Sequence, residues 1–160
     1  MLKLMGGVLL LGCFSYIGYY VAGMEGRRVR QAEGFLLLLR HIRAGIVCFA
    51  DPLAEIYHRF ENEALEACGF LAALREGGFL HALHACRDCL YITAEEVRIL
   101  HAFGSEVGKS NTREQAGACD YAIGELEGAL RRHREEAPRR ARAARSLAVC
   151  GGLALLILLL

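Results

Sequence analysis

Uncharged stretches mark both ends of this chain, and amphipathic stretches fill the region between them. Leu4–Met24 and Ser146–Leu160 contain no charged side chain. About 20 apolar residues in a helix cross the hydrocarbon core of a bilayer. We therefore predict one transmembrane helix over residues 4–24. A second is predicted over residues 146–160, which reach the required length if the helix starts near Ala143 and Arg145 extends to the interface.

Arginine residues flank each apolar stretch on the side that faces the middle of the chain. Because basic residues next to a span stay on the cytoplasmic side, both flanks predict the same topology. Residues 25–145 would lie in the cytoplasm, with both chain ends across the membrane. The net charge of only +1 and the lack of interleaved aromatics disfavour nucleic-acid binding. The predicted membrane collar consists of Arg27, Arg28, Arg30, Arg139, Arg140, Arg142 and Arg145.

Each end also has an alternative interpretation. Lys3 and a cleavage site at Val21-Ala22-Gly23 would fit a signal peptide. The length of the apolar stretch and the arginines after it favour a retained span. For residues 146–160 the alternative is a terminal helix packed on a soluble core.

The central region has the periodicity of helices and no convincing alternation of a strand. Phe35–Leu39 is apolar on every side, which predicts a buried turn, and Ile42, Ile46 and Phe49 continue its stripe. Asp51 is expected to cap the next helix, with Pro52 in its first turn, followed by an inward Leu53.

Glycines and capping residues divide the rest of this region. Gly77-Gly78 is expected to separate a helix over residues 70–76 from one over 79–90. Thr93 with Glu96 forms a capping box, and Gly108 is expected to end the helix that starts there. A second capping pattern at Asn111 opens a long helix with an apolar seam. The predicted fold is all-α, a cytoplasmic bundle of about six helices flanked by the two transmembrane helices.

Candidate chemistry is concentrated in one short segment. His81, His84, Cys86 and Cys89 are residue types that bind zinc, and Cys86 with Cys89 has the spacing of a redox motif. On one helix, however, Cys86 would project about 140° from His81, so the spacing favours ordinary helix faces. A metal- or redox-sensing membrane protein is therefore the alternative function. We find no other catalytic arrangement, and we expect neither an enzyme nor a cofactor.

Several short motifs of this chain occur together in one known family. The segment around the second capping pattern is close to F-G-x-x-L-G-x-S-D-x-x-x-Q, with Val107 in place of Leu and Asn111 in place of Asp, and the ends MLKLMGGVLLLG and SLAVCGGL also match. The candidate partner-contact or structural-turn residues that carry the resemblance are Asp51, Pro52, Leu53, Phe103, Gly104, Gly108, Ser110, Asn111 and Gln115. In these motifs the chain resembles the stage III sporulation protein AB family.

This resemblance implies a function in a sporulation complex that links mother cell and forespore during engulfment. The family is similar to the cytoplasmic domain of the type II secretion platform protein, the F component. The resemblance further implies a platform in the mother cell membrane that docks a cytoplasmic hexameric ATPase, the stage III AA protein. Other stage III A proteins, including the ring-forming AG and AH proteins, would be indirect partners.

Small residues in the predicted spans leave the packing of these spans open. Ala144, Ala148 and Gly152 are spaced by four, as are Gly18 and Ala22. Such spacing allows close helix packing, either within one molecule or in a homo-oligomer. A tail-anchored scaffold without a motor partner is a third interpretation of the chain.

Overall fold

The computed structural model describes the backbone of residues 26–49, 51–109 and 111–159, and the side chains in these ranges up to residue 135. The chain divides into two compact units, of which one is Arg27–Leu130 and the other combines Met1–Gly26 with Arg131–Leu160. Every regular element in the described ranges is helical, which confirms the predicted all-α class. The elements are a helix over 26–44, the π-helical turn η1 (Gly45–Phe49), α2 (Leu53–Arg59), α3 (Glu63–Ala67), α4 (Phe70–Ala85), the 3-10 turn η2 (Arg87–Cys89), α5 (Ala94–Glu106) and α6 (Thr112–Leu159).

The helix over residues 26–44 forms the centre of the unit Arg27–Leu130. Phe35, Leu38, Leu39 and Ile42 on this helix are completely buried. The prediction that the apolar turn is buried on every side was wrong at Leu37, whose side chain is 50% exposed. The surrounding helices cover only part of this turn, so one side of it remains open to solvent.

Aromatic rings link the helix over residues 26–44 to α4 and α5. The ring of Phe70 contacts those of Phe35 and Phe79 at centroid distances of 4.8 and 5.7 Å, and Phe79 contacts Phe103 at 5.0 Å. All three contacts are edge-on, the arrangement that the charge distribution of the rings favours. Each such pair adds about 1 kcal/mol beyond the burial of apolar area. This chain of rings forms the middle of the core.

Short polar and glycine signals start and stop α3. The Asn62 side chain accepts a hydrogen bond from the Leu65 amide at 3.2 Å, which caps the start of α3. Gly69 then adopts a left-handed conformation with φ of 77° between α3 and α4. An L side chain is strained in this conformation, so the break between α3 and α4 has a backbone cause.

Gly78 interrupts the helical backbone within α4. Its φ of 81° and ψ of −176° are not helical, which confirms the predicted separation at Gly77-Gly78. The second helical part, however, ends at Ala85, whereas we predicted an end at Leu90. The chain continues from Cys86 into η2, where the Cys89 amide donates to the Cys86 carbonyl at 2.9 Å. Local turn formation thus replaces the last helical turn that we expected.

The capping box at the start of α5 is confirmed and includes a buried carboxylate. Glu96 is 1% exposed. Its Oε2 accepts hydrogen bonds from the Thr93 amide at 2.6 Å and the Thr93 hydroxyl at 2.7 Å. The Glu96 amide in turn donates to the Thr93 hydroxyl at 3.3 Å. Both capping interactions satisfy donors that a helix start would otherwise leave without a partner.

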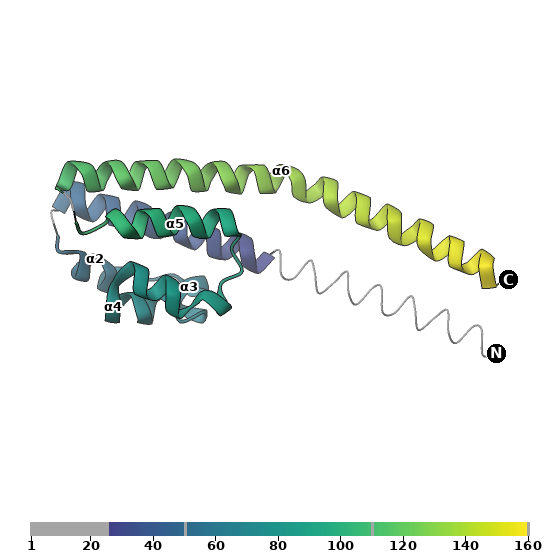
Figure 1. Cartoon of the computed structure of the whole chain (residues 1–160), viewed down its shortest axis with the longest axis horizontal. Coiled ribbons are helices and arrows are strands. Elements are labelled where there is room, and N and C mark those ends of the chain that lie inside the picture. Colours follow the sequence, from purple (N-terminus) through teal and green to yellow (C-terminus); the bar gives the residue numbers. More distant parts are fainter. Residues whose placement is uncertain (1–25, 50, 110, 160) are drawn as a thin grey trace. The chain divides into compact units, whose positions relative to one another are not determined.

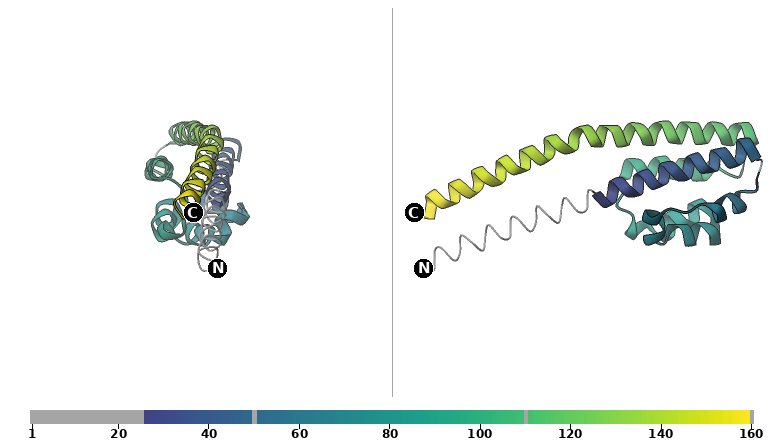
Figure 2. Two further views of the ribbon diagram at one scale, coloured as in Figure 1. Left: turned by 90° about the vertical axis from the view of Figure 1, so that its right-hand side faces the viewer. Right: turned by 180° about the vertical axis from the view of Figure 1, so that it is seen from behind.

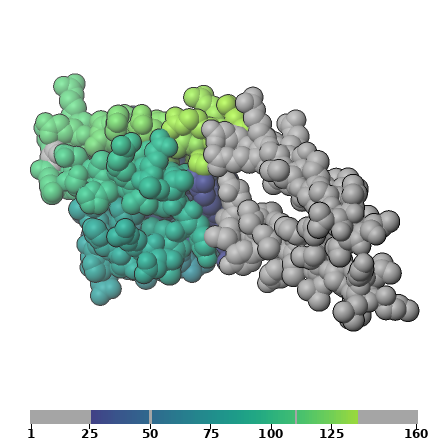
Figure 3. Space-filling view, turned by 45° about the vertical axis from the view of Figure 1, so that its right-hand side comes forward, coloured from purple at the N-terminus to yellow at the C-terminus, as the bar shows by residue number. Residues whose placement is uncertain are grey.

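The first part of α6 lies antiparallel to the helix over residues 26–44 (Figures 1 and 2). Two exposed ion pairs, Arg40 with Glu127 and Arg43 with Asp120, join the two helices. The predicted seam consists of Ala116, Cys119, Ile123, Leu126 and Leu130. Cys119, Leu126 and Leu130 are buried as predicted, whereas Ala116 and Ile123 are only partly buried. Figure 3 shows this part of α6 in green along the upper edge of the unit, with the teal side chains of α4 and α5 beneath it.

The two predicted spans remain predictions. The range 4–24 lies outside the described residues, and of residues 146–160 only the helical backbone up to Leu159 is described. In the part of the chain that the structure describes, no helix has both the length and the apolar content needed to cross a membrane.

Candidate partner-binding surface

The first segment that we predicted to contact a partner lies at the start of α2. Pro52 is the N-cap residue of α2, and its carbonyl accepts from the Glu55 and Ile56 amides at 2.9 and 3.1 Å. The prediction that Asp51 caps this helix was wrong. The helix starts at Leu53, one residue later than an Asp51 cap requires, and the Asp51 carboxylate accepts from Arg59 Nη1 at 2.9 Å.

The second predicted segment is the turn between α5 and α6. The Val107 amide donates to the Phe103 carbonyl at 3.0 Å, and Gly108 follows with φ of 84°. This confirms a glycine-dependent end of α5, because the left-handed conformation suits glycine. At the start of α6, Asn111 Oδ1 accepts from the Glu114 amide at 3.0 Å, which confirms the predicted capping pattern.

These two segments meet in the folded chain. A Cβ atom placed on Gly108 would lie 3.1 Å from Leu53 Cδ1. Leu53 and Val107 are partly buried and both pack against the hydrophobic core. Figures 1 and 2 agree in placing the end of η1 and the start of α6 at this same end of the unit. We refer to the residues Val47, Phe49, Leu53, Val107, Gly108, Lys109 and Asn111 as the tip surface.

Other predicted contact residues lie inside the unit. Phe103 is 3% exposed, and Gly104 is also buried. A Cβ atom on Gly104 would come within 2.9 Å of the Phe79 ring, so glycine here permits the close packing of α5 on α4. Gln115 is half-buried, and its backbone amide donates to the Asn111 backbone carbonyl at 3.0 Å. Phe103, Gly104 and Gln115 therefore shape the turn from within, and Ser110 lies outside the described residues.

Exposed apolar side chains next to the predicted turn escaped the sequence analysis. Val47 is 49% exposed and Phe49 is 71% exposed, both on η1. The prediction that Phe49 continues the buried stripe was wrong. A π-helical turn has more residues per turn than an α-helix, so it shifts the side chains that follow it around the axis. The sequence contains no local signal for this turn.

Exposed charged residues of both signs flank the turn between α5 and α6. They are Glu106 and Lys109 before the start of α6, and Arg113 and Glu114 in its first turn. Farther along α6, the Asp120 carboxylate accepts hydrogen bonds from the Arg43 guanidinium, and this bonding and the carboxylate charge raise the pKa of Arg43. An apolar centre with a polar rim is the usual composition of a protein–protein interface. The tip surface therefore has the properties of a site for a protein partner.

The arginine side chains of the predicted membrane collar lie in different environments. Arg28 points into the unit, where its Nη2 lies 3.5 Å from the buried Glu96 carboxylate. The Arg27 guanidinium lies over the Tyr91 ring at 5.9 Å, and Arg30 is exposed. Arg28 thus contributes to the folded unit in addition to any effect on topology. The side chains of Arg139, Arg140, Arg142 and Arg145 lie outside the described residues.

The structure gives no support to the alternative metal site. His81 and His84 are exposed on α4, Cys86 is buried, and Cys89 is exposed at the end of η2. Burial raises the pKa of the Cys86 thiol, which opposes formation of the thiolate that binds metals. Within the described ranges, no group of three or more histidine, cysteine or acidic side chains is arranged to hold a metal ion.

The described part of the chain forms a small all-α unit with exposed apolar side chains on η1. The family model of stage III sporulation protein AB matches residues 3–160, and the chain belongs to this family. A solved structure of a stage III sporulation protein AB is 20% identical. The match covers 69% of this chain and 96% of that one, with a TM-score of 0.56, and therefore shows the fold alone. None of the curated protein sequences matches the chain.

Proposed function

We propose that this chain is a non-enzymatic platform component in the mother cell membrane, within the channel complex of sporulation. Its two terminal helices would anchor the unit Arg27–Leu130 at the cytoplasmic face, and its tip surface would dock the stage III AA ATPase. Membership of the stage III sporulation protein AB family supports the role in sporulation. Anchoring and docking are the additional steps of the proposal.

The exposure of Phe49 and Val47 is the observation that supports docking at the tip. Both side chains are at least 49% exposed on a unit whose other large apolar residues are mostly buried. The helix over residues 26–44 contains 19 residues and is therefore about 28 Å long. The tip surface lies beyond the C-terminal end of this helix. A soluble motor could therefore reach it.

Two connections would couple the docked motor to the membrane. Gln31 is 5% exposed, and its side chain donates to the Cys89 carbonyl at 3.2 Å and accepts from the Tyr91 amide at 2.7 Å. Together with the Arg28–Glu96 pair, it fixes the start of the helix over 26–44 to the segment that leads into α5. The other connection is α6, which is helical from Thr112 to Leu159. Stiff connections of this kind favour the transmission of force.

Reconstituted membranes test the proposal directly. The full-length chain in liposomes would be mixed with the purified AA ATPase, and binding would be measured by flotation over a range of ATPase concentrations. We expect saturable binding to the wild type. Phe49→Ala should weaken it at least about 10-fold, as removal of a central interface side chain does. Tyr121→Ala is the matched control, because Tyr121 is 67% exposed on α6 and lies outside the tip surface.

The same variants report on function in sporulating cells. Phe49→Ala and Asn111→Ala should lower spore yield and ATPase recruitment while the protein remains in the membrane fraction. Normal recruitment by both variants would refute docking at the tip surface. Absence of any binding by the wild type would refute docking of the ATPase altogether and favour a scaffold without a motor partner.

A further inference from the structure

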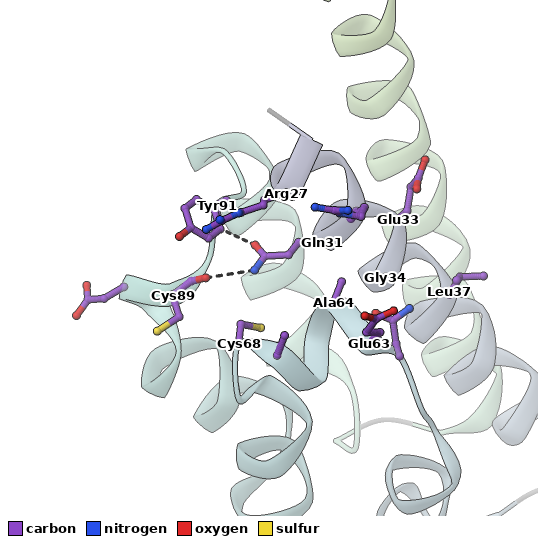
Figure 4. Close-up of a pocket in the computed structure, with 14 residues that line it drawn as sticks. Arg27, Gln31, Glu33, Gly34, Leu37, Glu63, Ala64, Cys68, Cys89 and Tyr91 are labelled. Atoms are coloured by element: carbon purple, nitrogen blue, oxygen red, sulfur yellow. Dashed lines mark hydrogen bonds between the residues drawn. The ribbon is translucent and has the colours of Figure 1, made fainter. Parts of the chain in front are cut away.

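A groove of about 730 Å³ lies between the first half of the helix over residues 26–44, α3 and the segment that contains η2. Its volume falls in the range of about 300–1,000 Å³ that is usual for small-molecule sites. Figure 4 shows Arg27 and Gln31 on one side of this groove and Glu63 with Ala64 on α3 on the other. The groove is separate from the tip surface, and the proposed function makes no use of it.

The floor of the groove is closed and its polar atoms are already bonded. Gly34 lies against α3 so closely that an added Cβ would be 2.7 Å from Asn62 Oδ1. This oxygen already caps α3. The Gln31 amide is bound at both its oxygen and its nitrogen by the backbone at Cys89 and Tyr91. The capacity to bind a ligand therefore lies with the charged side chains around the groove.

Charges of opposite sign lie on different elements of the groove wall. Arg27 and Arg30 extend from the long helix, whereas Glu63 belongs to α3 and Asp88 to η2. Among the described residues, Arg30, Glu63 and Asp88 form no ion pair, in contrast to Arg28 and Arg40 on the same helix as Arg30. Glu33 adds a further carboxylate to the wall. A ligand that carries both a negative and a positive group would complement this arrangement.

The position of Arg27 in the chain indicates where such a ligand would come from. Arg27 is the third residue after the end of the predicted span at Met24. Three residues can reach at most about 11 Å. The headgroup layer on each side of a bilayer is about 5–8 Å thick. If the first span is inserted, Arg27 must therefore lie in or beside the headgroup layer.

We propose that this groove binds the headgroup of a phospholipid that carries a primary ammonium group, of the phosphatidylethanolamine class. The lipid phosphate would contact the guanidinium groups of Arg27 and Arg30, and the ammonium would donate hydrogen bonds to Glu63. The three carboxylates of the wall disfavour a headgroup with negative charge alone. A choline headgroup has the same net charge but no N–H donor for Glu63. The inference rests on the membrane anchoring proposed above.

Lipid retention by the full-length protein tests this inference. The protein would be reconstituted in bilayers of equal parts phosphatidylethanolamine, phosphatidylcholine and phosphatidylglycerol, extracted in mild detergent, and analysed by native mass spectrometry. We expect about one retained phosphatidylethanolamine per chain, in at least about fivefold excess over each of the other lipids. Arg30→Gln and Glu63→Gln should each reduce this excess to the bulk ratio, because both side chains face the groove.

Matched variants and separate outcomes make the test decisive. Arg98→Gln and Glu61→Gln change exposed charges outside the groove and should retain the lipid like the wild type. Circular dichroism should show unchanged folding in all four variants. Equal retention of the three lipids, a preference for phosphatidylglycerol, or wild-type retention by Arg30→Gln and Glu63→Gln would overturn the inference alone. Failure of the wild type to insert into the bilayer would overturn the proposed anchoring as well.

Discussion

Removal of the Glu96 carboxylate should strongly destabilise the unit Arg27–Leu130. This carboxylate is 1% exposed and accepts three hydrogen bonds, two from Thr93 and one from Arg28. Breaking a buried ion pair from one side costs about 3–5 kcal/mol. The Arg28 side chain is 15% exposed, so water compensates part of this loss. We therefore expect Glu96→Ala to lower the free energy of unfolding by about 3 kcal/mol, a large share of the stability of a small domain.

Urea unfolding of the full-length chain in detergent, followed by circular dichroism, measures this effect. Arg28→Ala should lower the free energy of unfolding by about 2 kcal/mol, since it leaves the Glu96 carboxylate buried without its cation. Arg30→Ala is the matched control, because it removes an exposed arginine of the same collar and should change stability by less than about 0.5 kcal/mol. Equal effects of the two arginine variants, or a Glu96→Ala effect below about 1 kcal/mol, would refute the reasoning.

Two further predictions concern glycine and pH. Gly78→Ala should lower the unfolding free energy by about 1–3 kcal/mol because φ is 81° there, whereas Gly117→Ala on open helix surface should raise it by about 0.5–1 kcal/mol. Burial raises the pKa of Cys119 to about 11 and that of Tyr57 to about 12. Because folding favours the protonated forms, the contribution of these two groups to stability should be constant below pH 9 and fall as the pH rises towards 12, with a smaller loss in Cys119→Ala. Equal melting temperatures of the two glycine variants, or stability that rises in this pH range, would contradict these expectations.

Features that depend on neighbouring residues were predictable from the sequence. Thr93 with Glu96, Asn111 with Glu114, and the break at Gly78 each rest on interactions within four residues of the chain. The chemistry of such a short segment is the same in the sequence and in the fold, which is why these predictions were confirmed.

Features that depend on distant residues were not predictable. Arg28 pairs with a glutamate 68 residues away, so its position in the sequence suggested a membrane collar and no more. The exposure of Phe49 follows from a π-helical turn that no residue pattern announces. Asp51 seemed to be a helix cap, but the helix begins one residue later and Arg59 binds its carboxylate. Tertiary contacts decide each of these cases.

The candidate site also combines features that were predictable from the sequence with features that were not. The sequence indicated the segments at Leu53 and Gly108, but only the fold brings them together and leaves Phe49 exposed. Phe103 and Gly104, which carry part of the family resemblance, pack in the core beneath the turn. The groove near Arg27 combines residues from three elements and has no linear signature.

Labelling of the exposed thiol of Cys48 tests the central claim, that the unit Arg27–Leu130 faces the cytoplasm. Intact and permeabilised sporulating cells would be treated with a membrane-impermeant maleimide, and the modified peptide would be identified by mass spectrometry. The account predicts that Cys48 is labelled only after permeabilisation. Labelling of Cys48 in intact cells would place the unit outside the cytoplasm and contradict the account, since a cytoplasmic ATPase could not reach the tip surface.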